Sequence, residues 1–171
     1  MRIRRLEAQE WPAYRALRLR SLAEAPHAFG SSLATEEAWR HELWMARLQA
    51  ASESGRDCPL VAETDTDGSL HGLVWAKCDA EQAGLVNLFQ MWVAPEARGQ
   101  GVAAALLRDA IAWARSIGAQ RVRLGVVDGN DAAARLYARA GFCDVGVPEP
   151  LRPGSGTLEQ TMQLDLGTDP R

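Results

Sequence analysis

Two glycines and an arginine stand close together in the segment Arg98-Gly99-Gln100-Gly101. Glycine lets a backbone turn sharply, and the N–H groups of such a turn and of a following first helical turn have no intrahelical partner. Together with the helix dipole, these N–H groups form a site for an anion. Arg98 adds a charge that suits phosphate oxygens. The segment therefore predicts a diphosphate-binding turn in which backbone N–H groups do most of the binding.

A strand and a helix must hold this turn in place. Leu85–Val93 is an apolar, β-leaning run typical of a buried strand, and Pro95 ends it because proline has no N–H for a ladder. After the glycines, a helix with one apolar stripe is predicted, and Gly118 ends it. The stripe consists of Val102, Ala103, Leu106, Leu107, Ala110, Ala114 and Ile117.

Two other phosphate-binding motifs match this turn less well. No lysine follows Gly101, which excludes a Walker A loop. Gly99, Gly101 and Ala104 fit the loose dinucleotide fingerprint G-x-G-x-x-G/A. That motif also expects an acidic residue about 20 positions later, where this chain has Arg121 and Arg123. A nicotinamide or flavin dinucleotide protein is therefore the weaker alternative.

Two longer segments, in order along the chain, carry a family resemblance. They are Val93-Ala-Pro95-Glu-Ala-Arg98-Gly-Gln-Gly101-Val-Ala103 and Asn130-Asp-Ala-Ala133-Ala-Arg-Leu136-Tyr137-Ala-Arg-Ala-Gly141-Phe142. The first resembles the acyl-CoA-binding signature of the GNAT N-acetyltransferase superfamily, Q/R-x-x-G-x-G/A after an apolar strand and V-x-P-x-x-R. The second resembles a later element of that family at the expected distance. The resemblance covers about residues 57–166 well and the first 56 residues only generically.

This resemblance implies a site for acetyl-CoA. The backbone of Met91 and Val93 would pair with the pantetheine arm as a strand does, and an N–H near Val93 would polarise the thioester carbonyl. Asn130 would touch the CoA arm. The plainer interpretation is that Met91 and Val93 are core residues and that Asn130 caps a helix or forms a turn. The diphosphate would lie on Arg98, Gly99, Gln100, Gly101, Val102 and Ala103.

The resemblance also implies that Tyr137 is the general acid that protonates the departing thiolate. The plainer interpretation is a core tyrosine with its hydroxyl at the surface. An alkylammonium must lose a proton before it attacks, yet the strand Leu85–Val93, where the family often carries the base, has no carboxylate. The base is therefore left open among Glu36, Glu37, Asp79, Glu81, Asp128 and His27.

These features predict an N-acetyltransferase that moves the acetyl group of acetyl-CoA to a primary amine by direct attack in a ternary complex. The sequence has no Cys/His pairing, which fits a reaction without an acyl-enzyme. The acceptor, a small molecule or a peptide, stays open. A non-catalytic acyl-CoA-binding or sensing module on the same fold is the alternative. Homodimers are common among similar proteins, so a homodimer is a further expectation.

Composition limits the other possibilities. The net charge of −3 gives no basic footprint for nucleic acid, and no run approaches the ~18 apolar residues of a membrane span. Three scattered cysteines and an N-terminus without an apolar signal region predict a cytoplasmic protein with reduced thiols. Three histidines, with no metal spacing among themselves or with the cysteines, predict no metal. They are His27, His41 and His71.

The order of predicted elements indicates one domain over residues 1–171, of the α+β class, a mixed α/β three-layer arrangement. We expect a mixed, mostly antiparallel sheet of about seven strands flanked by about four helices. The resemblance implies that this sheet is splayed after its central strand, Leu85–Val93. One helix is expected from Thr35 to about Ala50, and residues 167–171 are expected to form a disordered tail.

Overall fold

The computed structural model describes residues 1–167, so the predicted disordered tail lies, apart from Gly167, outside the described residues. The strands are β1 Arg2–Arg5, β2 Asp57–Glu63, β3 Leu70–Cys78, β4 Leu85–Val93, β5 Arg121–Val127, β6 Cys143–Asp144, β7 Glu149–Pro150 and β8 Leu158–Asp165. The α-helices are α1 Trp11–Glu24, α2 Leu33–Glu37, α3 His41–Ser54, α4 Val102–Ser116 and α5 Asp131–Arg139. Two short 3-10 helices, Ala8–Glu10 and Pro95–Ala97, precede α1 and the glycine turn.

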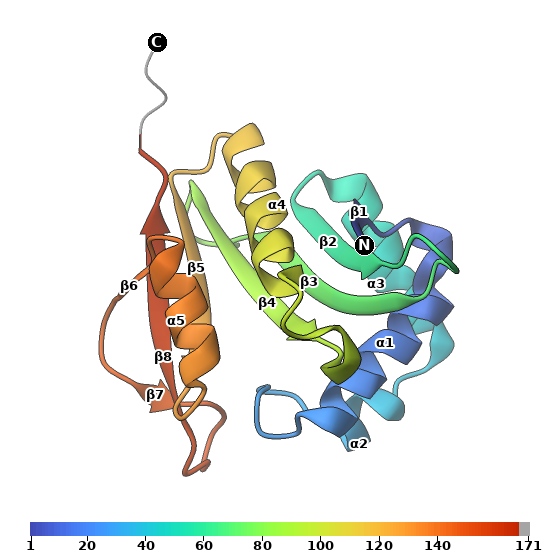
Figure 1. Cartoon of the computed structure of the whole chain (residues 1–171), viewed down its shortest axis with the longest axis horizontal. Coiled ribbons are helices and arrows are strands. Elements are labelled where there is room, and N and C mark those ends of the chain that lie inside the picture. The colour runs from blue at the N-terminus through green and yellow to red at the C-terminus, as the bar shows by residue number, and fades with distance from the viewer. Residues whose placement is uncertain (168–171) are drawn as a thin grey trace.

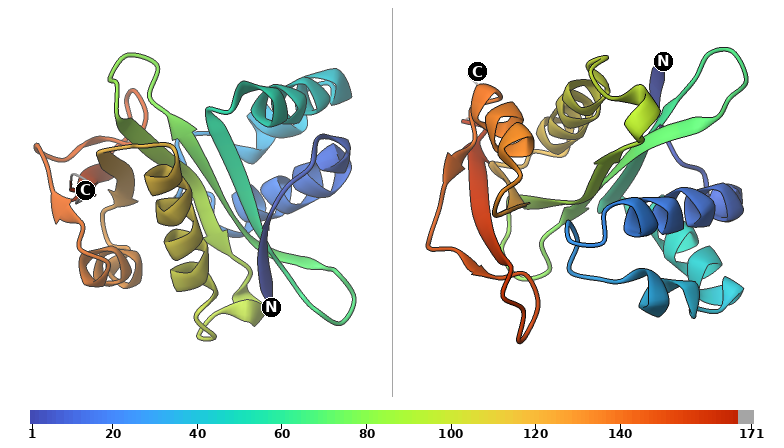
Figure 2. Two further views of the ribbon diagram at one scale, coloured as in Figure 1. Left: turned by 90° about the horizontal axis from the view of Figure 1, so that it is seen from above. Right: turned by 60° about the horizontal axis from the view of Figure 1, so that its bottom comes forward.

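The eight strands form one mixed sheet in the order β1-β2-β3-β4-β5-β8-β6, with β7 also beside β8. Neighbouring strands are antiparallel except for β4 and β5, which are parallel because α4 carries the chain back between them. The helices cover both faces: α1, α2 and α3 lie on one side and α4 and α5 on the other (Figure 2). The expected mixed, mostly antiparallel, three-layer architecture is confirmed.

Each face of the sheet has its own core. On the α4 and α5 side, Leu106 and Leu107 of α4 pack with Val86 of β4 and Val122 of β5. The three- and four-residue spacing predicted for α4 brings most of this apolar stripe onto the sheet, but its predicted last member, Ile117, lies past the end of the helix and is 40% exposed. The other face is built around aromatic residues, among them Tyr14 of α1, Trp44 of α3 and Trp92 of β4.

The sheet opens between its two parallel strands. Leu85, Val86 and Asn87 of β4 pair with Arg121, Val122 and Arg123 of β5, and beyond Asn87 the two strands have no further register partners in each other. Figure 1 shows them diverging from this shared end. The predicted splay after the central strand is therefore confirmed, and it leaves the second half of β4 with an edge that β5 does not cover.

A β-bulge interrupts β4 where it opens. Leu73 pairs with Trp92 and Trp75 pairs with Phe89, so β4 has one residue more than β3 between these two pairs. Gln90 has φ +62°, a conformation that non-glycine residues adopt uncommonly. The Tyr14 hydroxyl donates to Oε1 of Gln90 over 2.8 Å and ties the bulge to α1. The sequence carries no glycine or other signal for this bulge.

The helix predicted from Thr35 to Ala50 is wrong in its boundaries. Ser32, not Thr35, is the N-cap: its Oγ accepts the Thr35 N–H over 3.2 Å, and α2 ends at Glu37. α3 begins separately at His41. The break turns Glu36 inward to Arg18, with which it forms a buried ion pair, so a tertiary contact overrides the local helical pattern.

Candidate functional site

The glycine turn leads from β4 into α4. Gly99 and Gly101 have φ values of +75° and +78°, and a Cβ at either position would meet no atom within 4 Å. Gly101 is the N-cap of α4, and the helix's first backbone bond runs from the Ala105 N–H to the Gly101 carbonyl over 3.0 Å. The N–H groups just before Ala105 consequently have no intrahelical acceptor. The predicted open turn with free donors at a helix N-terminus is present.

Arg98 holds this turn against the rest of the molecule. Its Nε donates to the Val93 carbonyl over 3.0 Å, and its terminal nitrogen donates to Glu24 of α1 over 2.8 Å. Trp92 Nε1 donates to the same Glu24 carboxylate, and these contacts lower the pKa of Glu24. Half of the Arg98 side chain is still exposed beside the turn. Arg98 thus has a structural task, and its contact with phosphate remains a prediction.

A second ion pair connects α1 to the 3-10 helix that precedes the turn. Arg20 of α1 donates to both oxygens of Glu96 at 2.7 and 2.8 Å, and this contact lowers the pKa of Glu96 to about 2. Gln100 Nε2 donates to the Glu96 carbonyl over 3.2 Å. The Gln100 side chain is therefore directed back toward the 3-10 helix that precedes the turn.

The backbone of β4 faces the opening of the sheet. The Ala94 N–H donates to the carbonyl of His71 in β3 over 2.7 Å. Because successive backbone groups in a strand point to opposite sides, the N–H of Val93 is directed away from β3, toward the uncovered edge. The Val93 side chain is buried, as its plainer interpretation predicts. Gln90 and Met91, in the bulge, have no register partner in β3.

Helix α5 brings Asn130 and Tyr137 to the other side of the opening. Asn130 is the N-cap, and its Oδ1 accepts the Ala133 N–H over 3.2 Å, so the capping interpretation is confirmed. The Tyr137 side chain is buried against Phe142, with ring centroids 6.0 Å apart, and burial raises its pKa to about 12. Within residues 1–167 its hydroxyl makes no hydrogen bond, and Tyr137 lines the cleft described next.

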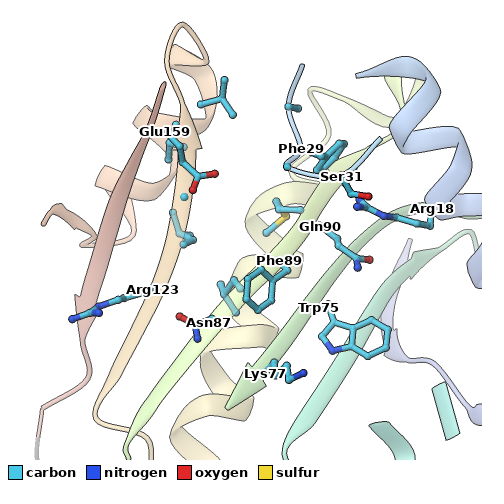
Figure 3. Close-up of a pocket in the computed structure, with 18 of the residues that line it drawn as sticks. Arg18, Phe29, Ser31, Trp75, Lys77, Asn87, Phe89, Gln90, Arg123 and Glu159 are labelled. Atoms are coloured by element: carbon cyan, nitrogen blue, oxygen red, sulfur yellow. The ribbon is translucent and has the colours of Figure 1, made fainter. Parts of the chain in front are cut away.

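A cleft of about 910 Å³ occupies the opening between β4 and β5. Its floor carries Trp75, Lys77, Phe89 and Gln90, and Figure 3 shows these side chains below Phe29 and Glu159 in that view. Several aromatic side chains line it, and Phe89 is about half exposed (48%). A cleft of this size and lining can hold a small organic ligand.

The structure brings part of the predicted site together. Met91, Asn130 and Tyr137 all line the cleft. The residues of the predicted diphosphate site lie outside its lining, where the edge of β4 leads into α4. They are Arg98, Gly99, Gln100, Gly101, Val102 and Ala103, together with Val93 at the end of the strand.

Most of the residues considered as general bases lie outside the cleft lining. Of that set, Glu36 alone lines the cleft, and its carboxylate is engaged by Arg18 through bonds of 2.9 and 3.0 Å. Asp79 instead accepts the N–H groups of the turn that follows it, and Asn87 Nδ2 donates to it over 2.9 Å. Glu37, Glu81, Asp128 and His27 do not line the cleft.

Sequence reasoning missed Glu159, a cleft-lining carboxylate on β8. The available signal was Gly125, a glycine inside an alternating strand, which marks a close approach of another group. Among residues 1–167 no group of three or more His, Cys, Asp or Glu side chains is arranged to hold a metal ion. In the same part of the chain, every helix is too short or too polar to span a bilayer.

The sequence matches the model of the acetyltransferase (GNAT) family over residues 11–142. It is 37% identical over 84 residues to a mycothiol acetyltransferase of Stackebrandtia nassauensis, covering 48% of this chain and 28% of that protein. In five curated mycothiol acetyltransferases that it matches, the aligned share is 27–37% of their length.

Two solved structures have a similar fold. A GCN5-related N-acetyltransferase from Kribbella flavida is 25% identical, with a TM-score of 0.75 over 96% of this chain and 97% of that one. A GNAT superfamily phosphinothricin acetyltransferase from Sinorhizobium meliloti, in complex with acetyl-CoA, is 20% identical, with a TM-score of 0.79 over 99% and 92%. The second likeness concerns the fold alone.

Proposed function

Because the chain belongs to the acetyltransferase (GNAT) family, we propose that it transfers the acetyl group of acetyl-CoA to a primary amine. The observation that carries this proposal is the uncovered edge of β4, which leads through a 3-10 helix and the glycine turn to a helix N-terminus with free N–H groups. A molecule with a diphosphate followed by an amide-containing arm suits this arrangement. Its anion would meet the turn, and its amides would pair with the strand edge.

In this proposal each predicted residue has a separate task. The N–H groups from Gly99 to Ala103 bind the diphosphate, and the outward groups of Met91 and Val93 hold the arm so that its thioester enters the cleft. A backbone N–H of β4 stabilises the oxyanion that forms when the amine attacks. Tyr137 hydrogen-bonds the departing sulfur, and Asn130 contacts the arm from the start of α5.

Release of free thiol from acetyl-CoA tests the proposed activity. Purified protein should accelerate this release only when an acceptor is added, because direct attack forms no acyl-enzyme. A panel of amines, amino acids and peptides would define the acceptor class. Tight acetyl-CoA binding without acceleration by any member would instead favour the non-catalytic acyl-CoA-binding module.

Replacing Gly101 with alanine tests the turn. Alanine at φ +78° costs about 1–2 kcal/mol of strain, and its methyl group would enter the open space proposed for the diphosphate. We expect the Kd for acetyl-CoA to rise about tenfold or more, which corresponds to at least ~1.4 kcal/mol. Calorimetric titration measures this change.

The matched control is Gly55→Ala at the end of α3. Gly55 also has a positive φ, +67°, and open space around its Cβ position, but it does not line the cleft. We expect a similar loss of stability with an unchanged Kd. Equal Kd values in the two variants would contradict the assignment of the turn as the diphosphate site.

A further inference from the structure

The cleft contains one carboxylate that the proposed mechanism has not used. Glu159 of β8 is half-buried in its wall, and within residues 1–167 its side chain joins no ion pair or hydrogen bond. Burial raises its pKa. A carboxylate with this environment favours proton uptake more than an exposed one does.

A glycine on the neighbouring strand makes room for this carboxylate. β5 and β8 pair so that Val127 lies opposite Glu159 and Gly125 opposite Thr161. A Cβ at Gly125 would overlap the Glu159 carboxyl group, with both oxygens 2.6 Å away. Glu159 therefore lies across β5 at the position of a missing side chain. It extends from β8 toward the opening of the sheet rather than toward bulk solvent.

Strand alternation places this carboxylate on the face opposite α4 and α5. Val122, Leu124 and Val126 of β5 belong to the core under those helices, so Gly125 faces the other way. That face is the one on which Phe29 and Gln90 line the cleft. Figure 3 shows the Glu159 carboxylate directed into the space between the strands, toward the side where Phe29 and Gln90 lie.

We propose that Glu159 receives the ammonium group of the acceptor and removes its proton. This inference rests on the proposed acetyl transfer. The Glu159 carboxylate takes one proton from the ammonium, and the free amine then forms a bond to the thioester carbon. The C–S bond breaks as the tetrahedral intermediate collapses. The sulfur gains a proton from Tyr137, the second amine proton restores the tyrosine, and Glu159 releases its proton to solvent.

The rest of the cleft is suited to an amine attached to an apolar or aromatic body. Phe29, Trp39, Trp75 and Phe89 line it. An ammonium on such a body would find its counterion in Glu159, because the other carboxylates there are engaged. Glu36 is held by Arg18, and Asp57 accepts the Trp75 Nε1–H over 2.9 Å.

Other ionisable groups lie near Glu159, and a pH profile must distinguish their ionisation from that of Glu159. Arg123 lies on the same face of β5, where its Nε donates to Gln163 over 2.7 Å, and Glu149 of β7 is the register partner of Glu159. The remaining ionisable groups that line the cleft are Arg18, Glu36, Arg47, Asp57, Lys77 and Tyr137. Removal of the carboxylate that acts as the base should move the acidic limb to the pKa of the amine itself, ~10.

Two amines of different basicity test the proposal with Glu159→Gln. Phenethylamine is protonated at neutral pH and matches the aromatic lining, whereas hydroxylamine is already unprotonated. We expect kcat/KM for phenethylamine at pH 7 to fall about 10²-fold, while the value for hydroxylamine changes far less. The acidic limb of the phenethylamine profile should also move up to the pKa of the amine itself, ~10, because only the unprotonated amine then reacts. Calorimetry should give an unchanged Kd for acetyl-CoA.

Asp165→Asn removes a carboxylate from the same strand outside the cleft and should leave both amines unaffected. Gly125→Ala should displace the Glu159 carboxylate and lower phenethylamine turnover, yet add little in the Glu159→Gln background. Equal losses with the two amines, an acidic limb that keeps its wild-type position, or no acceleration by wild-type protein with bound acetyl-CoA would overturn the role of Glu159. Failure of wild-type protein to bind acetyl-CoA would instead contradict the proposed function.

Discussion

Tyr137→Phe is expected to lower kcat for acetyl transfer by at least about 10²-fold while the Kd for acetyl-CoA changes little. The hydroxyl lines the cleft without a protein hydrogen-bond partner among the described residues, so its removal leaves no buried group unsatisfied. Single-turnover thiol release with the acceptor amine measures the chemical step, and calorimetry measures binding.

The acidity of Tyr137 determines how its hydroxyl can act on the leaving sulfur. Burial raises its pKa to about 12, above the value of ~8.5 typical of a thiol. Complete proton transfer to a free thiolate would therefore run uphill. We expect the hydroxyl to stabilise the sulfur through a hydrogen bond and to deliver its proton as the amine's second proton replaces it. Tyr137 should then cause no loss of kcat up to about pH 10.

Tyr14→Phe is the matched control, since Tyr14 is also buried with its pKa raised to about 12. Its hydroxyl donates to Gln90, so the change should lower stability by about 1 kcal/mol and reduce kcat far less. A Tyr137→Phe protein with the turnover of wild type would contradict the acid role and support the plainer interpretation of a core tyrosine.

Glu36→Gln is expected to cause the largest loss of stability, about 3–5 kcal/mol. Arg18 and Glu36 are 4% and 2% exposed and share two bonds of 2.9 and 3.0 Å. Neutralising the carboxylate leaves the guanidinium buried without its counterion, with the ring of Phe29 4.7 Å away. Urea unfolding followed by tryptophan fluorescence measures the change.

Two comparisons give this prediction its control. Asp109→Asn breaks an exposed pair with Arg108 and should cost less than about 1 kcal/mol. Arg18→Met combined with Glu36→Leu removes both charges and should recover much of the loss, because an apolar replacement of a buried pair is often neutral. A loss below about 1 kcal/mol for Glu36→Gln would show that water reaches Arg18.

The elements with strong local signals could be predicted from the sequence. The alternating and apolar strands, the stripe of α4 and the parallel crossover to β5 follow from patterns inside single segments. Asn130 caps α5 as its residue type favours. The glycine turn has the backbone conformation that two glycines permit.

The features that were missed depend on contacts between distant segments. The bulge at Gln90 is held by Tyr14, 76 positions away, and the break between α2 and α3 is accompanied by the pairing of Glu36 with Arg18. Glu159 enters the cleft because Gly125 on another strand leaves space. A single-segment pattern contains none of this information, which is why the acceptor side was the least predictable part of the site.

Calorimetric titration with acetyl-CoA, CoA and NADP in parallel tests the central claim most directly. The account predicts saturable binding of acetyl-CoA, alone or together with CoA, and no binding of NADP. It also predicts weaker acetyl-CoA binding in Gly101→Ala. Absence of binding to either CoA species, under conditions where the protein is folded, would contradict the account and leave the glycine turn as a structural feature.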